Sequence, residues 1–203
     1  MSLTAVPDGE IATIVTSLQM RARPRPRPAP ASRLRLDRWR EPAPDRYRTL
    51  FRRVGAPWLW FSRLVMSDEA LMAIVHHPAV ELYAVTDARG IELGMLELDF
   101  REPATCEIAY FGLVPELTGQ GEGRWLMAHT LMLAWRADIE RVWVHTCTLD
   151  HPKALGFYRA QGFEPYARVV ETFADPRLAG LLPADVAPQI PLIGPLTVAS
   201  SER

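Results

Sequence analysis

CEIAYFGLVPELTGQGEGRWLM, residues 106–127, is the stretch that decides the fold. Its first half belongs to an apolar run over residues 105–114 that is typical of a strand, and the residues that follow the glycines have the period of a helix. Between the two, residues 119–123 carry glycine at every second position. Glycines at the start of a helix leave backbone N–H groups uncovered, and with the helix dipole these groups attract anionic phosphate oxygens. We therefore expect a phosphate-binding turn here, with Arg124 adding positive charge at its rim.

Two commoner phosphate-binding loops do not match this turn. A Walker A loop requires Gly-Lys-Ser/Thr, and none follows these glycines. A dinucleotide fingerprint requires glycine at the sixth position, where this chain has Arg124, and an acidic residue at the end of the next strand, which here reads RVWVHTCT. A glycine at the start of a helix destabilises it by roughly 1 kcal/mol relative to alanine. Three of them favour a binding role over a merely flexible turn.

The patterns on both sides of this stretch predict an α/β protein with a mixed sheet and helices on both faces. Runs with a period of two or rich in β-branched residues predict strands, and runs with a period of 3.6 predict helices. Strands are expected over residues 11–20, 32–39, 80–86, 91–100, 105–114, 141–148 and 163–173, and helices over 45–54, 67–77, 124–138 and 151–161. Asp45 and Ser67 are the predicted helix N-caps.

Length, composition and charge are those of a globular protein. The 203 residues are 48% hydrophobic and 23% charged with a net charge of -1, which suits one domain with appendages and excludes global disorder. Cys106 and Cys147 match no metal-site spacing and are expected to be free thiols. No stretch approaches the roughly 18 apolar residues of a membrane span, and the N-terminus does not resemble a signal peptide. We expect a cytoplasmic protein that binds neither a metal nor a membrane.

Two segments stand apart from the predicted core. RARPRPRPAPA, residues 21–31, has proline at every second position and is predicted to be an extended arm or loop. An exposed linker is the main interpretation, and a ligand for a proline-binding module or a contact to phosphates are the alternatives. Residues 1–53 carry a net charge of +7 but the remainder carries -8, so nucleic-acid binding is not expected. Residues 178–203 are predicted to form a tail, over the core or mobile, that follows a single domain at residues 1–177.

The chain resembles the GNAT superfamily of acetyl-CoA-dependent N-acetyltransferases. The resemblance rests on residues 106–127, which look like the family's glycine loop and its preceding strand, and on HTCTLDHPKALGFYRAQGFEPYA, residues 145–167. The second segment contains the Tyr-x-x-x-Gly-Phe pattern at Tyr158, and the two segments have the order and separation found in the family. The resemblance covers roughly residues 33–175. It implies a mostly antiparallel central sheet in which the strands on either side of the long helix splay apart.

The resemblance also implies where acetyl-CoA binds as a cosubstrate. Backbone groups at the positions matching Leu113 and Val114 would bond the pantetheine arm. The pyrophosphate would rest on N–H groups matching Gly119, Gln120, Gly121, Glu122, Gly123 and Arg124. The chain departs from the family pattern at Thr118, where Gln or Arg is usual, and at Asp150, where Asn is common and which would lie near the pantetheine.

Acetyl transfer to an amine needs a base for the ammonium, donors for the developing oxyanion and an acid for the leaving thiolate. Tyr158 matches the family's thiolate-facing tyrosine and is the candidate general acid. A backbone N–H near Val114 is the candidate oxyanion donor. Glu107 matches the catalytic Glu of the histone-acetylating branch, and its position within a strand predicts a raised pKa. His145, His129 and a chain of water molecules are the alternative bases.

The acceptor is less defined by the sequence than the cosubstrate. Trp58, Trp60 and Phe61 are predicted either to wall an acceptor pocket or simply to belong to the core, and Glu97 or Asp99 to hold a cationic amine. A small polyamine-like amine, an amino-acid or antibiotic amine, and the N-terminus or Lys of a peptide or protein all remain open. A catalytically idle acyl-CoA-binding module that senses or recruits is the alternative function. The sequence leaves the oligomeric state open, a homodimer included.

Overall fold

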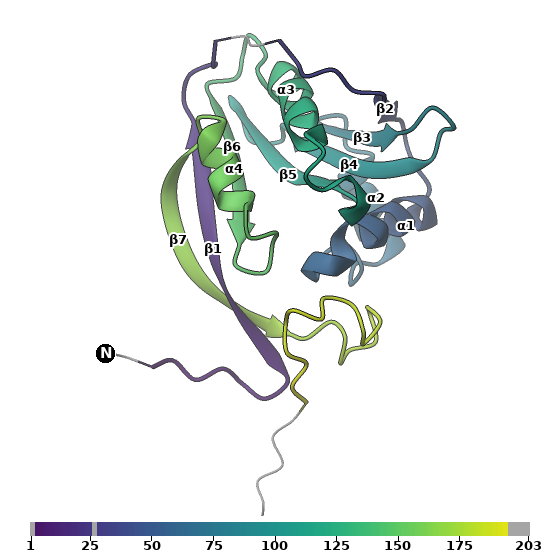
Figure 1. Ribbon diagram of the computed structural model, residues 1–203, viewed down its shortest axis with the longest axis vertical. Coiled ribbons are helices and arrows are strands. Elements are labelled where there is room, and N and C mark those ends of the chain that lie inside the picture. Colours follow the sequence, from purple (N-terminus) through teal and green to yellow (C-terminus); the bar gives the residue numbers. More distant parts are fainter. Residues whose placement is uncertain (1–2, 26–27, 195–203) are drawn as a thin grey trace, which may run out of the picture.

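A mixed sheet forms the centre of the protein (Figure 1). The structure is a computed structural model that describes residues 3–25 and 28–194. Within these residues the strands are β1 (Glu10–Met20), β2 (Arg35–Trp39), β3 (Val80–Thr86), β4 (Glu92–Asp99), β5 (Thr105–Leu113), β6 (Arg141–Cys147) and β7 (Glu164–Ala174). Their order in the sheet is β2-β3-β4-β5-β6-β1-β7, and only β5 and β6 pair in parallel. The prediction of a mixed, mostly antiparallel sheet is confirmed.

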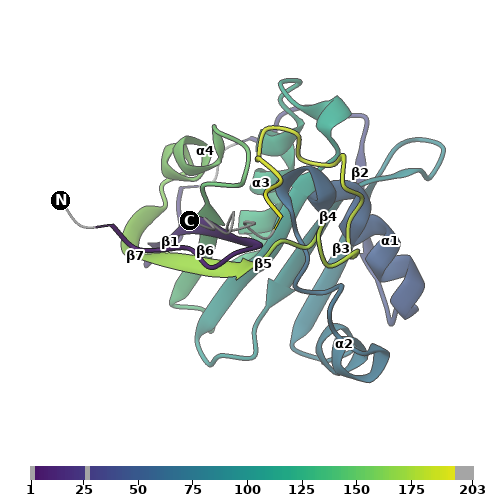
Figure 2. The same cartoon turned by 90° about the horizontal axis from the view of Figure 1, so that it is seen from below.

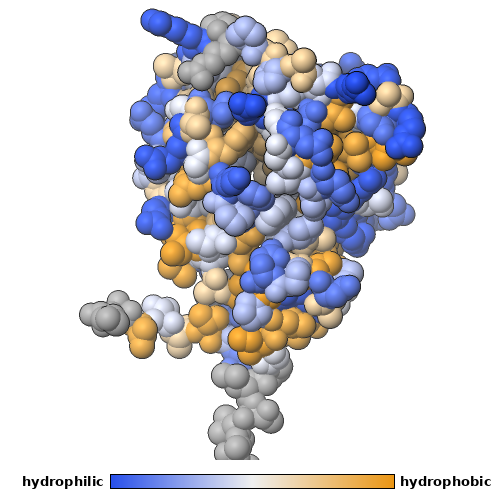
Figure 3. All heavy atoms as spheres, viewed as in Figure 1, coloured by the Kyte–Doolittle hydropathy of each residue, from blue (hydrophilic) through white to orange (hydrophobic). Residues whose placement is uncertain are grey.

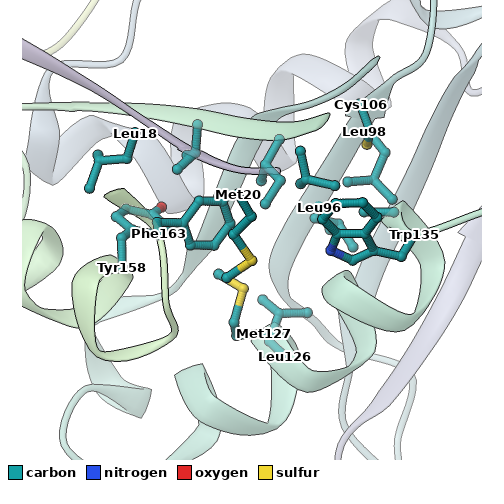
Figure 4. Close-up of a cluster of buried hydrophobic side chains, with 14 of the residues drawn as sticks. Leu18, Met20, Leu96, Leu98, Cys106, Leu126, Met127, Trp135, Tyr158 and Phe163 are labelled. Atoms are coloured by element: carbon teal, nitrogen blue, oxygen red, sulfur yellow. The ribbon is translucent and has the colours of Figure 1, made fainter. Parts of the chain in front are cut away.

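Helices cover both faces of this sheet, as the sequence predicts (Figures 1 and 2). The helices are α1 (Pro44–Gly55), α2 (Asp68–Val75), α3 (Glu122–Ala134) and α4 (Ala154–Ala160), with short 3-10 turns η1 (Ala56–Trp58) and η2 (Pro115–Leu117). Helices α3 and α4 pack on one face against a core that includes Leu18, Leu98 and Leu126, all fully buried (Figure 4). Helices α1 and α2 pack on the other face around Phe51 and Leu71.

One of the two predicted helix caps is correct. The side chain of Ser67 accepts a hydrogen bond from the amide of Ala70, which is the predicted cap of α2. The predicted cap of α1 is wrong, because Asp45 lies inside the first turn and Ala43 precedes the helix without a side-chain cap. Pro44 explains the difference, since its fixed φ suits the first position of a helix and it has no N–H to satisfy.

The position of β1 is the main feature of the topology that the sequence does not predict. The strand lies between β6 and β7, with Val15 opposite Cys147 on one side and Val169 on the other. The connection through α3 joins two neighbouring parallel strands. The connection through α4 does not, because β1 separates β6 from β7. The N-terminal strand is therefore built into the half of the sheet that the C-terminal part of the chain completes.

Strands β5 and β6 separate soon after they begin. They pair only from Thr105 to Glu107 on β5 and from Arg141 to Trp143 on β6. The register between β4 and β5 shifts at Glu97, and such a bulge bends a strand. The predicted splay of these two strands is confirmed, and it opens the sheet at its centre.

The segment after β7 returns over the core. Arg177 is buried and donates hydrogen bonds to Asp175 and to the carbonyl of Ile190, and Leu182 and Ala187 join the core around α1. Residues 178–194 therefore lie over the core, one of the two predicted alternatives. Figure 3 shows apolar side chains gathered where this segment lies. Residues 195–203 of the predicted tail and residues 26–27 of the predicted arm are outside the described part of the chain.

Candidate functional site

A cleft of about 430 Å³ lies where β5 and β6 separate. Its wall is formed by the turn before α3, by helix α4 and strand β7, and by residues 56–62. We call residues 56–62 the aromatic loop. Its lining includes Trp58, Trp60, Phe61, Ser62, Tyr110, Phe111, Leu113, Thr118, Gly119, Gly123, His145, Asp150, Tyr158, Glu171 and Phe173. The cleft thus brings together residues that are far apart in the sequence and that the splayed strands hold at one place.

The turn before α3 has unused amide groups at and beside the edge of this cleft. The amides of Gly119, Gly121, Glu122 and Gly123 donate to no other residue in the described part of the chain. The amide of Gln120 is used, because it donates to the carbonyl of Leu117. Four free N–H groups at the N-terminal end of a 13-residue helix, where the helix dipole is positive, form the kind of site that binds phosphate oxygens.

Backbone geometry accounts for two of the three glycines in the turn. Gly119 and Gly121 have φ angles of 81° and 88°, in the left-handed region that favours glycine. Gly123 is helical, and a Cβ atom there would lie 3.9 Å from the ring of Phe157, an ordinary contact. The shape of the turn therefore requires glycine at 119 and 121, and it is this shape that exposes the amides.

The backbone of β5 offers a further donor to the cleft. The amide of Val114 donates to the carbonyl of Leu93 at 2.9 Å, so Val114 itself is not the free donor that the sequence suggests. In an antiparallel pair the amides of successive residues point to opposite sides. The amides of Leu113 and Phe111 consequently point away from β4, toward the side on which β6 has separated. Of these two amides near Val114, that of Leu113 is the candidate donor to the pantetheine arm and that of Phe111 the candidate oxyanion donor.

Tyr158 lies on α4 with its ring packed among Phe111, Phe157 and Phe163. The side chain is 7% exposed and lines the cleft, and its hydroxyl has no hydrogen-bond partner among the described residues. Burial, and to a lesser extent the carboxylate of Asp150, hold the pKa of this phenol well above its ordinary value. The hydroxyl is therefore protonated at neutral pH and free to donate.

Glu107 lies beside the cleft but does not line it. Burial raises the pKa of Glu107 from 4.5 to about 7, and the carboxylates of Asp99 and Glu97 add to this effect. The raised pKa agrees with the expectation for a carboxyl group in mid-strand. Glu107 lines a separate groove with Asp99 and Trp143, and its carboxylate is 3.8 Å from Nδ1 of His145, which does line the cleft.

Asp150 holds the end of β6 and the aromatic loop together. Its carboxylate accepts hydrogen bonds from the hydroxyl of Thr146 at 2.7 Å and the amide of Cys147 at 2.9 Å. It also accepts one from the indole N–H of Trp60 at 3.4 Å. The side chain therefore spans the cleft from β6 to the aromatic loop, a role that sequence reasoning missed because Trp60 is 90 residues away in the chain.

The two acidic residues that the sequence suggests for holding an amine are both occupied. Glu97 is fully buried and accepts hydrogen bonds from the hydroxyl of Tyr47 and the guanidinium of Arg63. Asp99 is bound by the guanidinium of Arg101. That expectation is wrong, because these carboxylates are neutralised by arginines on the same face of the sheet.

The structure brings only part of the predicted site into the lining of the cleft. Tyr158, Leu113, Gly119, Gly123 and Asp150 line it. Val114 is buried beside the cleft. The free amides of Gly121 and Glu122 lie on the same turn but belong to residues that do not line the cleft. Gln120 and Arg124 are exposed on the same turn. Glu122 accepts a hydrogen bond from Ser32 at 2.6 Å, so the residue that follows the proline-rich arm contacts the turn.

The described residues contain neither a cluster of metal-binding side chains nor a membrane-spanning helix. Residues 3–25 and 28–194 contain no group of three or more His, Cys, Asp or Glu side chains arranged to hold a metal ion. No helix in that part of the chain has the length and apolar character needed to cross a membrane.

Comparison with known proteins decides the family. The family model for the acetyltransferase (GNAT) family matches residues 18–163, more than half of the chain. This chain is a GNAT-family protein. The match includes the glycine turn and the helix of Tyr158, from the two segments that carry the sequence resemblance. No match was found among curated proteins.

Solved structures of GNAT proteins share the fold. A GCN5-related N-acetyltransferase from Sphaerobacter thermophilus is 14% identical with a TM-score of 0.60, and the match covers 79% of this chain and 51% of that one. A tandem GNAT protein from the clavulanic acid biosynthesis pathway is 20% identical with a TM-score of 0.53, covering 84% and 54%. This chain therefore spans about half the length of these two structures.

A third solved structure also shares the fold. An aminoglycoside acetyltransferase from an uncultured soil metagenomic sample, in complex with trehalose, is 19% identical with a TM-score of 0.52, and the match covers 64% of this chain and 88% of that one. At these identities the likeness shows the fold alone. The expected GNAT fold is confirmed.

Proposed function

We propose that this protein transfers an acetyl group from acetyl-CoA to a primary amine in a single direct step. The observation that carries the proposal is the cleft between β5 and β6, which connects the free amides before α3 with the hydroxyl of Tyr158 and with the aromatic loop. The donor set fits the cosubstrate, because four unused amides suit a diphosphate and the amide of Leu113 suits a strand-like contact to pantetheine. The family match supports the same reading.

The groups that line the cleft can each assist one part of the acetyl transfer. Acetyl-CoA supplies a thioester carbonyl, so that the C–N bond to the acceptor forms as the C–S bond breaks and CoA leaves as a thiolate. The amide of Phe111 donates a hydrogen bond to the carbonyl oxygen as negative charge develops on it, and the amide of Leu113 holds the pantetheine arm. The hydroxyl of Tyr158 donates its proton to the departing sulfur, and solvent returns a proton to the tyrosinate.

The base that takes the proton of the ammonium is Glu107 in this proposal. A carboxyl group with a pKa of about 7 is half ionised at neutral pH and suits a proton acceptor. Because Glu107 lies behind the cleft lining, the proton reaches it through His145, whose ring nitrogen is 3.8 Å from the carboxylate, or through water. The nitrogen loses its second proton to water as the C–N bond forms, which balances the proton that solvent returns to Tyr158, so that one proton is released overall.

Calorimetric titration with acetyl-CoA, followed by an assay of thiol release with a panel of amines, tests this function. The proposal predicts saturable binding of acetyl-CoA and release of free CoA that depends on the amine. No binding at high micromolar acetyl-CoA would exclude it. Binding without thiol release from any amine would instead identify an idle acyl-CoA-binding module that senses or recruits.

A further inference from the structure

We infer that the acceptor is a primary amine with a single positive charge on an apolar, preferably aromatic, body. This inference rests on the proposed acetyl transfer and names the class of amine that the same cleft takes. It follows from the groups that remain free on the side of the cleft formed by the aromatic loop and β7, where the cleft is lined by aromatic rings and by very few charges.

The aromatic wall is held in place rather than loosely folded against the surface. The indole of Trp60 lies over Gly55 and Gly112, because a Cβ atom would lie 2.6 Å from its ring at Gly55 and 3.0 Å from it at Gly112. Its ring centroid is 5.2 Å from that of Tyr110. The ring of Phe61 packs against Phe173 of β7 at 4.8 Å, so the loop reaches across the cleft to the last strand.

A buried ion pair anchors the same wall from behind. Arg63 follows the aromatic loop directly, pairs with the fully buried Glu97, and lies over the ring of Tyr110 at 5.2 Å. The hydroxyl of Tyr110 in turn shares a hydrogen bond with Ser62. A wall that is ordered before the ligand arrives loses little conformational entropy on binding, which favours a flat apolar ligand.

The charges of the lining match one ammonium group. The acidic residues of the lining are Asp150 and Glu171, and its one lysine is Lys153 on the side of α4. Asp150 already accepts three hydrogen bonds. Glu171 makes no ion pair or hydrogen bond with any described residue. It lies two residues from Phe173 on β7 and therefore on the same face of the strand. One free carboxylate beside aromatic faces can attract one cation, directly and through its interaction with the rings.

A polycation fits this lining poorly. Each additional ammonium group of a polyamine or an aminosugar would lose water against aromatic rings without gaining a carboxylate. The structure thus discriminates against such acceptors by leaving their extra charges unpaired, which is an effective way to build specificity.

Steady-state kinetics of thiol release with three amines tests the inference. The amines are 2-phenylethylamine, with one charge on an aromatic body, spermidine and kanamycin. We expect kcat/KM for 2-phenylethylamine to exceed that for either polycation by about tenfold or more. Glu171→Gln should lower kcat/KM for 2-phenylethylamine about tenfold, mainly through KM, because it removes the charge that attracts the ammonium.

Glu164→Gln is the matched control, since Glu164 is an exposed acid on the same strand outside the cleft lining. It should leave all three values unchanged. Faster turnover of spermidine or kanamycin would overturn the inference while leaving acetyl transfer intact, and so would an unchanged KM in Glu171→Gln. Thiol release from none of the three, with acetyl-CoA bound, would overturn both this inference and the proposed transfer to them.

Discussion

Tyr158 and Glu107 are two ionisable side chains whose pKa values burial raises, with different consequences for each. A phenol with a raised pKa keeps its proton at neutral pH and can only act as a donor. A carboxyl group raised to about 7 exchanges its proton within the working range of most enzymes. Tyr158 is therefore suited to donate a proton, and Glu107 is suited to accept one.

Replacing Tyr158 by phenylalanine removes one hydroxyl and leaves the packed ring in place. Because this hydroxyl has no protein partner among the described residues, the variant should fold as stably as the wild type. We expect kcat to fall by about 10–100-fold with little change in the affinity for acetyl-CoA. Thiol-release kinetics and calorimetry check the two quantities separately, and an unchanged kcat would remove Tyr158 from the mechanism.

Glu107→Gln should remove the rise of kcat/KM with increasing pH. In the wild type, kcat/KM should rise as the pH increases through about 7, because Glu107 must lose its proton to act as a base. Asp99, Glu97, Arg63, Arg101 and His145 are the charged or titratable groups that act on this carboxyl group. The variant should be slower and lack that rise, whereas a profile with the same rise would assign the titration to another group.

The same substitution has an effect on stability with a definite sign. Since folding raises the pKa of Glu107 from 4.5 to about 7, the folded state disfavours the ionised form. The wild type therefore loses stability as the pH rises between these values, and Glu107→Gln should not. Melting temperatures at pH 5 and pH 8 would show it, with a gain of a few degrees in the variant at pH 8 only. A variant that melts below the wild type at pH 8 would contradict this account.

At the scale of elements, the start of α3 shows what the sequence can predict and what it cannot. The glycine spacing, the apolar strand before it and the helical period after it predict the turn and its exposed amides correctly. The predicted cap Asp45, in contrast, is wrong, because Pro44 takes the first position of α1 and Asp45 falls inside its first turn. The use of Asp150 to hold Trp60 depends on a contact across 90 residues, which no local pattern reveals.

A comparison of Gly121→Ala with Gly90→Ala distinguishes the loss of stability caused by backbone strain from a loss of acetyl-CoA affinity. Both glycines have φ angles in the left-handed region, 88° at Gly121 and 80° at Gly90, but Gly90 lies in the turn between β3 and β4. Each variant should lose about 1–2 kcal/mol of stability. Only Gly121→Ala should weaken acetyl-CoA binding, by about tenfold, because it distorts the amide donors. Equal affinity in the two variants would exclude the turn from the binding site.

At the scale of the whole molecule, the first strand and the segment after the last strand complete one structure. Strand β1 enters the sheet between β6 and β7, and the segment after β7 packs on the core of α1. The hairpin of β3 and β4 and the crossover through α3 were predictable because their strands are neighbours in both sequence and space. The place of β1 was not, since long-range pairing leaves no periodic signal in the chain.

Arg177 is the residue on which the returning segment depends. Its side chain is 1% exposed and binds the carboxylate of Asp175, which is 2% exposed. Arg177→Ala would leave that carboxylate buried and unpaired, so we expect a loss of about 3–5 kcal/mol of stability by chemical denaturation. Gln189 donates to the carbonyl of Pro57 at 2.8 Å, so the variant should also raise KM for the amine by loosening the aromatic loop. A loss below about 1 kcal/mol would show that the segment is dispensable for folding.

The central claim is that unused amides at the start of α3 bind the diphosphate of acetyl-CoA in the cleft between β5 and β6. Backbone amide resonances recorded by NMR during a titration with CoA test it most directly. The account predicts that the amides of Gly119, Gly121, Glu122 and Gly123 shift together and saturate at one affinity, along with that of Leu113. Saturation of the protein by CoA with these resonances unmoved would contradict the claim.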